Sequence, residues 1–157
     1  PVLALLPLLP PQPQQTSMGE EEPVYSVKFN DEEARVGDDA WIAKDGHADV
    51  TYASEGHMGD TYCGDYVGKK RESDGATYTW NDPDVEEPSI AGTTYEGSYK
   101  DGQREGNGKM AFANGDSYTG AFSAGVRSGN GEYVYANGDK YSGEYADDKA
   151  NGTGSYT

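Results

Sequence analysis

The stretch that decides the fold is "YANGDKYSGEY", residues 135–145, in which Asn-Gly separates two aromatic runs. After it, Tyr141, Gly143 and Tyr145 follow one another at intervals of two residues. The same arrangement occurs 23 positions earlier as "FANGDSYTGAF", residues 112–122. Two is the side-chain period of a β-strand, and Asn-Gly between alternating aromatics is a strong hairpin signal. The stretch therefore predicts tandem β-hairpins.

The period of 23 residues defines repeat units that begin at Tyr95, Tyr118 and Tyr141. Each unit has aromatic residues at its first and fifth positions, glycine at the third, and a later pair of glycines. In the first unit, this alternation predicts strands near 95–99 and 108–112, with "KDGQRE" as the turn between them. The "ANGD" segments are predicted to turn into the next unit through type I′ turns, with positive φ at both central residues.

Glycine and tyrosine have complementary roles in this prediction. A glycine leaves bare backbone on one face of the sheet, and a tyrosine ring of the neighbouring strand can cover it. The composition, with 22 glycines, 13 tyrosines and 34% hydrophobic residues, fits a thin structure of this kind better than a thick core. We therefore expect each repeat to be stabilised by its neighbours.

The remainder of the chain divides by composition. Residues 1–23 are predicted to be an extended Pro/Gln-rich and acidic tail, whose first 17 residues read as leader sequence ahead of Met18 or as a signal-peptide fragment. Residues 24–60 read as a degenerate repeat or an irregular cap, 61–80 as a degenerate repeat, and 81–94 as an acidic loop. Residues 95–157 hold the three clear repeats.

These motifs resemble the MORN (membrane occupation and recognition nexus) repeats, whose pattern is Tyr-x-Gly-x-Tyr followed by Gly-x-Gly and aromatic alternation. The resemblance implies an all-β fold: an elongated, twisted, single-layer antiparallel sheet of hairpin repeats. Asp148 stands where the other units have a turn glycine, and Ser73 replaces one paired glycine, so we expect locally different turns there.

The resemblance also implies a function. "GKM" at 108–110 and the acidic insert are similar to the radial spoke head type of MORN protein. This implies a noncatalytic scaffold in the cytoplasm, within a ciliary or flagellar axoneme. The alternatives are an adaptor of a membrane-associated complex and a regulatory segment of a larger enzyme.

A single layer cannot bury both of its faces, so one face must meet water or a partner. Tyrosine is enriched at protein interfaces. We therefore expect other protein subunits as partners and edge-to-edge self-association as a further option. The predicted partner-binding residues form an aromatic stripe: Tyr62, Tyr66, Tyr95, Tyr99, Tyr118, Phe122, Tyr141 and Tyr145.

Charge argues against nucleic acid as a partner. The formal net charge is -16, and residues 19–94 carry 19 acidic and 6 basic side chains. Such a field repels phosphates. One basic run, Lys69, Lys70 and Arg71, could contact a lipid headgroup or an acidic partner, against the alternative of a solvated turn.

The sequence predicts no cofactor, no metal site and no catalytic residue. His47, His57 and the single Cys63 do not have the spacing of a zinc site, so we expect surface histidines and an unreactive, partly buried thiol. The glycine-rich "GNGKM" lacks the spacing of a phosphate loop. The acidic residues Asp82 to Glu87 lack the calcium-loop pattern and are expected to be solvated.

Overall fold

The computed structural model describes all residues except 1–24, 31, 35–43, 54–56 and 82–89. The described residues form strands and turns, with no helix among them. Accordingly, this described part offers no helix that could cross a bilayer. The strands are β1 Tyr25–Phe29, β2 Glu32–Ala34, β3 Gly46–Tyr52, β4 Thr61–Val67, β5 Lys70–Arg71, β6 Ser73–Thr79, β7 Thr94–Lys100, β8 Gln103–Ala111, β9 Ser117–Ser123, β10 Val126–Val134, β11 Lys140–Ala146 and β12 Lys149–Tyr156.

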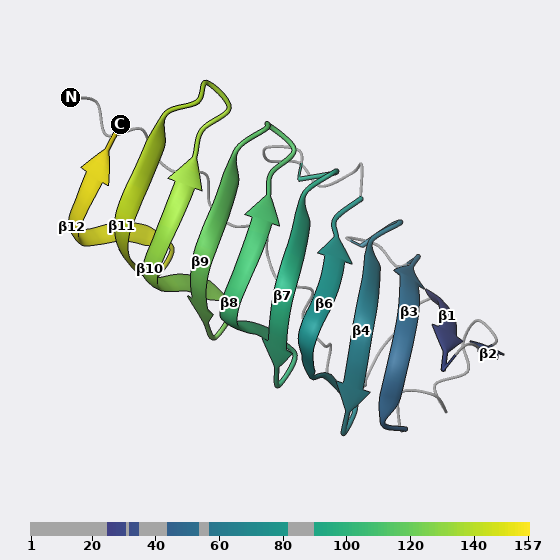
Figure 1. Cartoon of the computed structure of the whole chain (residues 1–157). Coiled ribbons are helices and arrows are strands. Elements are labelled where there is room, and N and C mark those ends of the chain that lie inside the picture. The colour runs from purple at the N-terminus through teal and green to yellow at the C-terminus, as the bar shows by residue number, and fades with distance from the viewer. Residues whose placement is uncertain (1–24, 31, 35–43, 54–56, 82–89) are drawn as a thin grey trace.

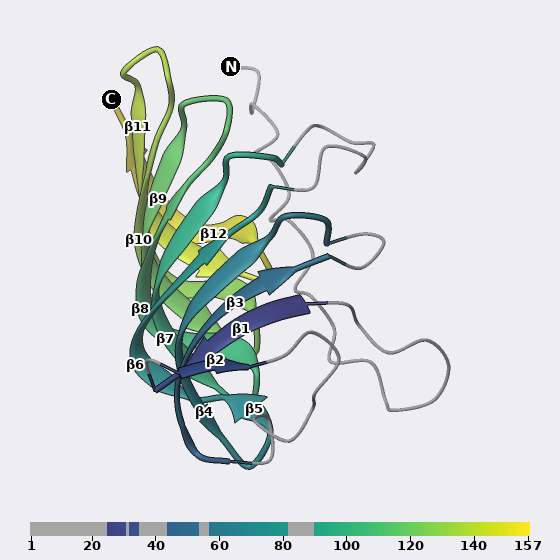
Figure 2. The same cartoon turned by 90° about the vertical axis from the view of Figure 1, so that its right-hand side faces the viewer.

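All twelve strands belong to one antiparallel sheet, in the order β12-β11-β10-β9-β8-β7-β6-β4-β3-β1-β2, with β5 paired to β4 (Figure 1). From β3 to β12, each strand pairs with the strand beside it in sequence, apart from the short β5. The strands bend along their length, as the side view shows (Figure 2). The prediction of an all-β, single-layer antiparallel sheet of tandem hairpins is confirmed.

The second strand of each repeat is longer than predicted. In the first unit it begins at Gln103 and not near Gly108, because the turn after β7 contains only Asp101 and Gly102. The pairing of β7 with β8 then shifts register at Gly97 and Ser98, where a β-bulge takes up the extra residues. The segment predicted as a broad turn is therefore mostly strand.

The two kinds of turn differ from the sequence prediction. At Asn114-Gly115 only the glycine has a positive φ, with a value of 90°, so this turn is not type I′. The Gly115 N–H donates to the Phe112 carbonyl, and the loop has three residues. Positive φ at both central residues occurs instead in the other turns, such as Asp101-Gly102 with 51° and 82°.

The substitution of glycine by Asp148 leaves the turn unchanged. Asp147 and Asp148 have φ of 47° and 64°, close to the values of Asp101-Gly102. The expected difference in turn geometry is therefore wrong at this position. Aspartate tolerates the left-handed region better than most residues because its side chain is short and polar. In addition, the Asp148 carboxylate accepts hydrogen bonds from the backbone N–H and the Nε–H of Arg127 on the neighbouring hairpin.

Pairing across the sheet places the side chains in two parallel rows, one on each face. The inner row is buried except toward β12, whereas every member of the outward row is exposed. The inner row consists of Val27, Val50, Tyr62, Tyr78, Tyr95, Met110, Tyr118, Tyr133, Tyr141 and Tyr156. The outward row consists of Lys28, Asp49, Cys63, Thr77, Glu96, Lys109, Thr119, Glu132, Ser142 and Ser155.

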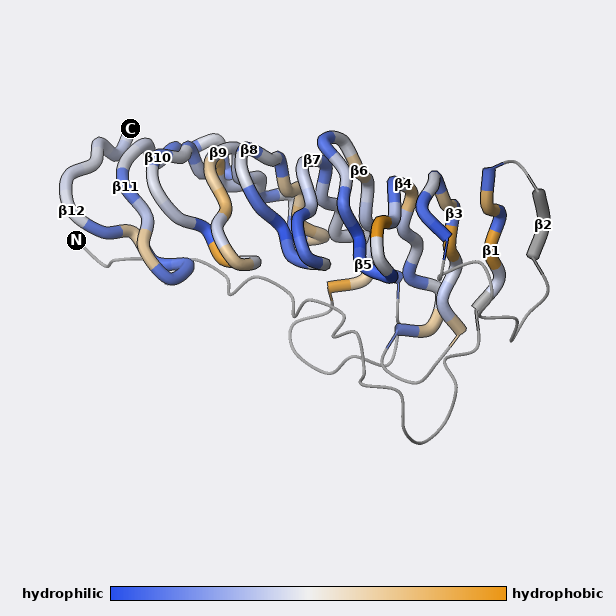
Figure 3. The backbone as a smooth tube through the Cα atoms, turned by 90° about the horizontal axis from the view of Figure 1, so that it is seen from below, coloured by the Kyte–Doolittle hydropathy of each residue, from blue (hydrophilic) through white to orange (hydrophobic). Residues whose placement is uncertain are grey.

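Hydropathy alone hides this division. Figure 3 shows only short hydrophobic segments along the tube, because the inner face is built largely from tyrosine, which ranks as slightly hydrophilic. β1 and β3 extend the same arrangement into 24–60, with Val27 and Val50 in the inner row. The predicted tail at 1–23 lies outside the described residues, as do residues 82–89 of the predicted acidic loop.

Candidate functional site

The aromatic stripe forms one continuous chain of edge-to-face ring contacts on the inner face. Neighbouring centroids lie 5.1 to 5.6 Å apart, with interplanar angles of 77° to 90°. Such contacts contribute about 0.5–1.5 kcal/mol each beyond the buried area. The order of rings is Tyr66, Tyr62, Tyr99, Tyr95, Phe122, Tyr118, Tyr145 and Tyr141.

This packing leaves the stripe little accessible surface to offer a partner. Tyr62, Tyr66, Tyr95, Tyr99, Tyr118, Phe122 and Tyr145 are each at most 3% exposed, and Tyr141 alone is partly exposed. The rings therefore serve the fold. Within the described part of the chain, the rings lie along the sheet and cover one another, and no second layer of strands packs on them.

Glycine provides the space for the rings to lie flat. The Tyr95 ring covers Gly97 on its own strand and Gly108 directly opposite on β8. A Cβ at Gly108 would stand 2.5 Å from Cε2 of Tyr95. The Tyr95 hydroxyl donates to the Ser98 carbonyl at 3.0 Å, which fixes the ring along the strand. The predicted pairing of glycine with tyrosine is confirmed, and the covering ring comes from the same strand as well as the neighbouring one.

Three buried arginines join each repeat to the next, and the sequence analysis missed this role. Arg71, Arg104 and Arg127 are at most 2% exposed, and each guanidinium lies 5.0 to 5.8 Å from the centroids of three aromatic rings. Each also donates to a carbonyl in the turn of the following unit, at Gly102, Gly125 and Asp148 respectively. The sequence signal was present, because each arginine stands nine positions after the first tyrosine of its unit.

A buried aspartate–tyrosine pair links most units a second time. Asp116 accepts hydrogen bonds from the Tyr133 hydroxyl at 2.6 Å and from the Ala136 N–H at 2.8 Å. The pKa of Tyr133 lies well above its ordinary value, chiefly because the phenol is buried and secondly because it donates a hydrogen bond to Asp116. Asp60 with Tyr78 repeats the buried pair at 2.8 Å, and Asp139 with Tyr156 forms an exposed version of it at 2.7 Å beside β12. The "GD" at 59–60, 115–116 and 138–139, which is absent before the unit that begins at Tyr95, is the sequence trace of this contact.

The predicted basic run does not form a cluster of three exposed cations. Arg71 is buried in its aromatic cage, Lys70 bonds Asp101 at 2.8 Å, and Lys69 lies exposed in the turn. The bond to Asp101 raises the pKa of Lys70, and the same bond lowers the pKa of Asp101. Of the three cations predicted to contact a lipid or an acidic partner, Arg71 is therefore inaccessible in this structure, and the two lysines lie beside the carboxylate of Asp101.

The outward face presents polar side chains across the whole width of the sheet. Its row carries Glu96, Lys109 and Glu132 on three of the repeat strands, with serine and threonine between them. The charges alternate, so no single-sign field dominates the repeats. Among the described residues, this is the face on which side chains remain accessible in every strand from β3 to β12.

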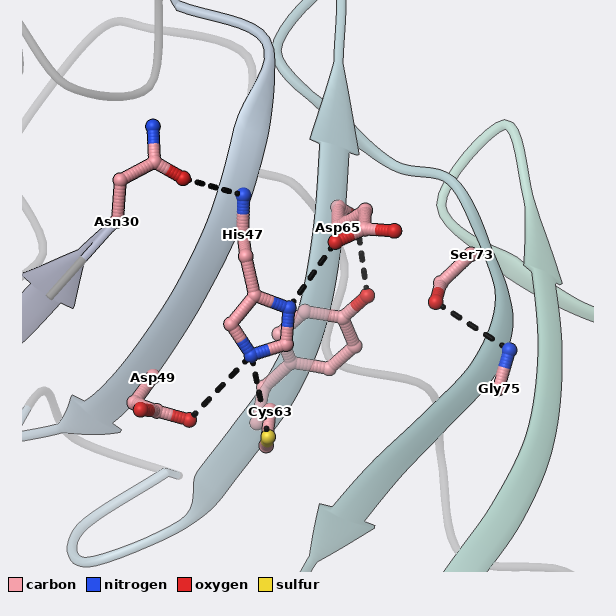
Figure 4. A network of polar contacts seen from close by, with 8 residues as sticks. Asn30, His47, Asp49, Cys63, Asp65, Ser73 and Gly75 are labelled. Carbon is pink, nitrogen blue, oxygen red and sulfur yellow. Dashed lines mark hydrogen bonds and ion pairs between the residues drawn. The ribbon is translucent and has the colours of Figure 1, made fainter.

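At one end of the outward face, β3 and β4 bring together residues that the sequence analysis had considered separately (Figure 4). Asp49 stands opposite Cys63, and His47 stands opposite Asp65. His47 Nε2 lies 3.5 Å from Cys63 Sγ and 3.9 Å from a carboxylate oxygen of Asp49. The thiol is exposed, so the expected partial burial is wrong, and a hydrogen bond to Asp49 raises the pKa of Cys63 to about 11.

The second histidine belongs to the inner structure. His57 is partly buried, and its Nδ1 lies 3.2 Å from the buried carboxylate of Asp60. It therefore caps one of the aspartate–tyrosine pairs and is not a plain surface histidine. The predicted acidic calcium candidates, Asp82 to Glu87, lie outside the described residues.

The comparisons with known proteins agree with this architecture. The family model of the MORN repeat matches residues 95–117, 118–140 and 141–157. No curated protein is significantly similar to the chain. MORN repeats generally mediate interactions with proteins or membranes, and the matched boundaries coincide with the units that begin at Tyr95, Tyr118 and Tyr141. Residues 95–157 are thus similar to three consecutive MORN repeats.

Proposed function

We propose that this protein is a noncatalytic scaffold that holds other protein subunits in a larger assembly through the outward face of its sheet. The observation that carries the proposal is the contrast between the two faces. The inner rings are sealed within the chain, whereas the outward row offers an exposed side chain on ten strands. A partner would therefore meet a wide, polar surface.

The noncatalytic part of the proposal rests on how the inner polar groups are used. Arg104 donates to the Gly125 carbonyl, and Asp116 accepts from Tyr133 and from backbone. Burial lowers the pKa of Arg104 to about 10, which still leaves the guanidinium charged at neutral pH. Each of these groups holds one repeat against the next, which is a structural task.

The proposed setting is a cytoplasmic, axonemal complex such as a radial spoke head. This setting rests on the resemblance to the spoke-head type of MORN protein and on the acidic charge, which favours protein partners over nucleic acid or anionic membrane. The burial of Arg71 reduces support for the membrane alternative, since stable attraction to anionic lipid calls for about four to eight clustered cations.

Affinity purification under mild conditions tests the proposal, with identification of the chains that co-purify. We expect axonemal subunits with the wild-type protein, and their loss with the double variant Glu96→Lys/Glu132→Lys, which reverses two outward charges without touching the core. Asp147→Lys, a charge reversal in an exposed turn away from the row, serves as the control. Recovery of organellar membrane subunits, or equal recovery with the double variant, would contradict the proposal.

A further inference from the structure

Four side chains on the outward face of β3 and β4 form a compact polar group. His47 and Asp49 alternate along β3, and Cys63 and Asp65 alternate along β4. Antiparallel register sets these two pairs directly opposite each other. One nitrogen, one sulfur and one carboxylate oxygen, from His47, Cys63 and Asp49, all lie within 4.8 Å of one another. Three different metal-binding atoms thus converge from two rigid strands.

The spacing of these atoms suits a tetrahedral metal centre. Metal–ligand lengths of about 2.0–2.3 Å place the ligand atoms of tetrahedral zinc about 3.3–3.8 Å apart. The Nε2 to Sγ distance of 3.5 Å already falls in this range, and the Nε2 to Asp49 distance of 3.9 Å needs only a small side-chain rotation. Both side chains are about half exposed and can make that adjustment.

We propose that His47 Nε2, Asp49 and Cys63 Sγ bind a divalent transition-metal ion of the zinc type. Imidazole and thiolate favour zinc over magnesium or calcium, which prefer oxygen ligands. Three protein ligands leave a fourth position for water.

Asp65 is the positioning residue of this site. Its carboxylate lies 3.0 Å from His47 Nδ1, on the side of the ring away from the ligand atom. A carboxylate that holds Nδ1–H fixes the tautomer that presents Nε2 to a metal. The Asn30 carboxamide also accepts from the His47 backbone N–H at 3.1 Å, which anchors this end of β3 (Figure 4).

The fold itself does not require this group of residues. The position of Cys63 in its unit is occupied by Glu96, Thr119 and Ser142 in the following units, and all of them are exposed. The repeat therefore accepts very different side chains at this offset. Packing does not explain why a thiol stands opposite a carboxylate and beside an imidazole at this place.

The test is a titration of the reduced, metal-stripped full chain with Zn²⁺ against a chromophoric chelator, followed by the absorption spectrum with Co²⁺. We expect one equivalent of Zn²⁺ per chain and a thiolate-to-cobalt charge-transfer band. Cys63→Ser should remove that band and weaken zinc binding by more than about tenfold. Asp65→Asn should weaken binding by about 10- to 100-fold while keeping the band.

Glu96→Gln is the matched control, because it removes one carboxylate from the same row outside the group. Its zinc affinity should equal that of the wild type. Far-ultraviolet circular dichroism should be unchanged in all variants, since these side chains are exposed. Absence of zinc uptake at micromolar concentrations, or equal affinity in wild type and Cys63→Ser, would overturn the proposal. Half an equivalent per chain with dimer formation would overturn a one-chain site.

Discussion

The unit that begins at Tyr95 lacks the buried aspartate–tyrosine pair, and this exception gives a sharp test of how the repeats are joined. Thr93 takes the place of the aspartate and Met110 takes the place of the tyrosine. Both are fully buried, at 1% and 0% exposure. The Ala113 N–H donates to Thr93 Oγ1 at 3.3 Å, in the position where Ala136 N–H bonds Asp116. The two replacements therefore belong together.

Thr93→Asp alone should destabilise the protein by about 3 kcal/mol, the lower end of what an uncompensated buried charge costs. The Ala113 N–H, which bonds Thr93 in the wild type, can donate to the new carboxylate, whereas the Met110 thioether has no hydrogen to donate to it. Adding Met110→Tyr supplies the missing hydroxyl, and a hydrogen bond to a charged group contributes about 1.5–3 kcal/mol. The double variant should therefore recover about 2 kcal/mol relative to the sum of the single variants.

Urea unfolding of the wild type, both single variants and the double variant measures this coupling as a double-mutant cycle. The slopes of the unfolding free energy against urea should agree among the four proteins. Tyr133→Phe, which removes the hydroxyl of an existing pair, is the companion measurement and should cost about 1.5–3 kcal/mol. A coupling below about 0.5 kcal/mol, the usual error of additivity, would refute the reasoning.

Four further outcomes are expected. Gly108→Ala should destabilise the sheet by about 1–3 kcal/mol in urea unfolding, because the added Cβ would meet the anchored Tyr95 ring. The control is Gly75→Ala, whose added Cβ meets nothing within 4 Å and which should change stability by less than about 0.5 kcal/mol. Arg104→Lys should cost about 1–3 kcal/mol, since an ammonium cannot keep both bonds to the Gly125 carbonyl, and the exposed Lys109→Met is its control. Burial raises the pKa of Tyr118 to about 12, so the phenol of the unfolded chain ionises at a lower pH than that of the folded chain. The contribution of Tyr118 to the free energy of unfolding is therefore complete below about pH 10 and should fall as the pH rises toward 12. Tyrosinate absorbance and circular dichroism, recorded together, measure this loss. In liposome flotation with phosphoinositides at physiological salt, wild type and Lys69→Ala/Lys70→Ala should both stay unbound; flotation of the wild type lost in the variant would revive the membrane alternative.

The candidate metal group shows why site prediction from sequence was incomplete. The ligands lie as His-x-Asp on one strand and Cys-x-Asp on the next, 16 positions apart between His47 and Cys63. Zinc motifs are recognised by short spacings within one segment. Here only the β3–β4 register makes the residues neighbours, and register is a property of paired strands.

The sequence by itself determined the sheet. Period 2 within a unit and period 23 between units define which residues share a face, because side chains alternate along any strand. The pairing of Gly108 with the Tyr95 ring followed from the same alternation and is confirmed. Local chemistry was a weaker guide to turns, since Asn114-Gly115, predicted as a type I′ turn, adopts a three-residue loop, while positive φ at both central residues occurs at Asp101-Gly102.

Only the tertiary structure decided which face is sealed. Alternation places Tyr95 and Tyr118 together, but it does not reveal that edge-to-face ring contacts and buried arginines such as Arg104 enclose these rings. It equally hides the contact of Arg104 with a turn that lies 21 positions later. The physical reason is that periodicity acts along one strand, whereas burial depends on the twist and register of several strands at once.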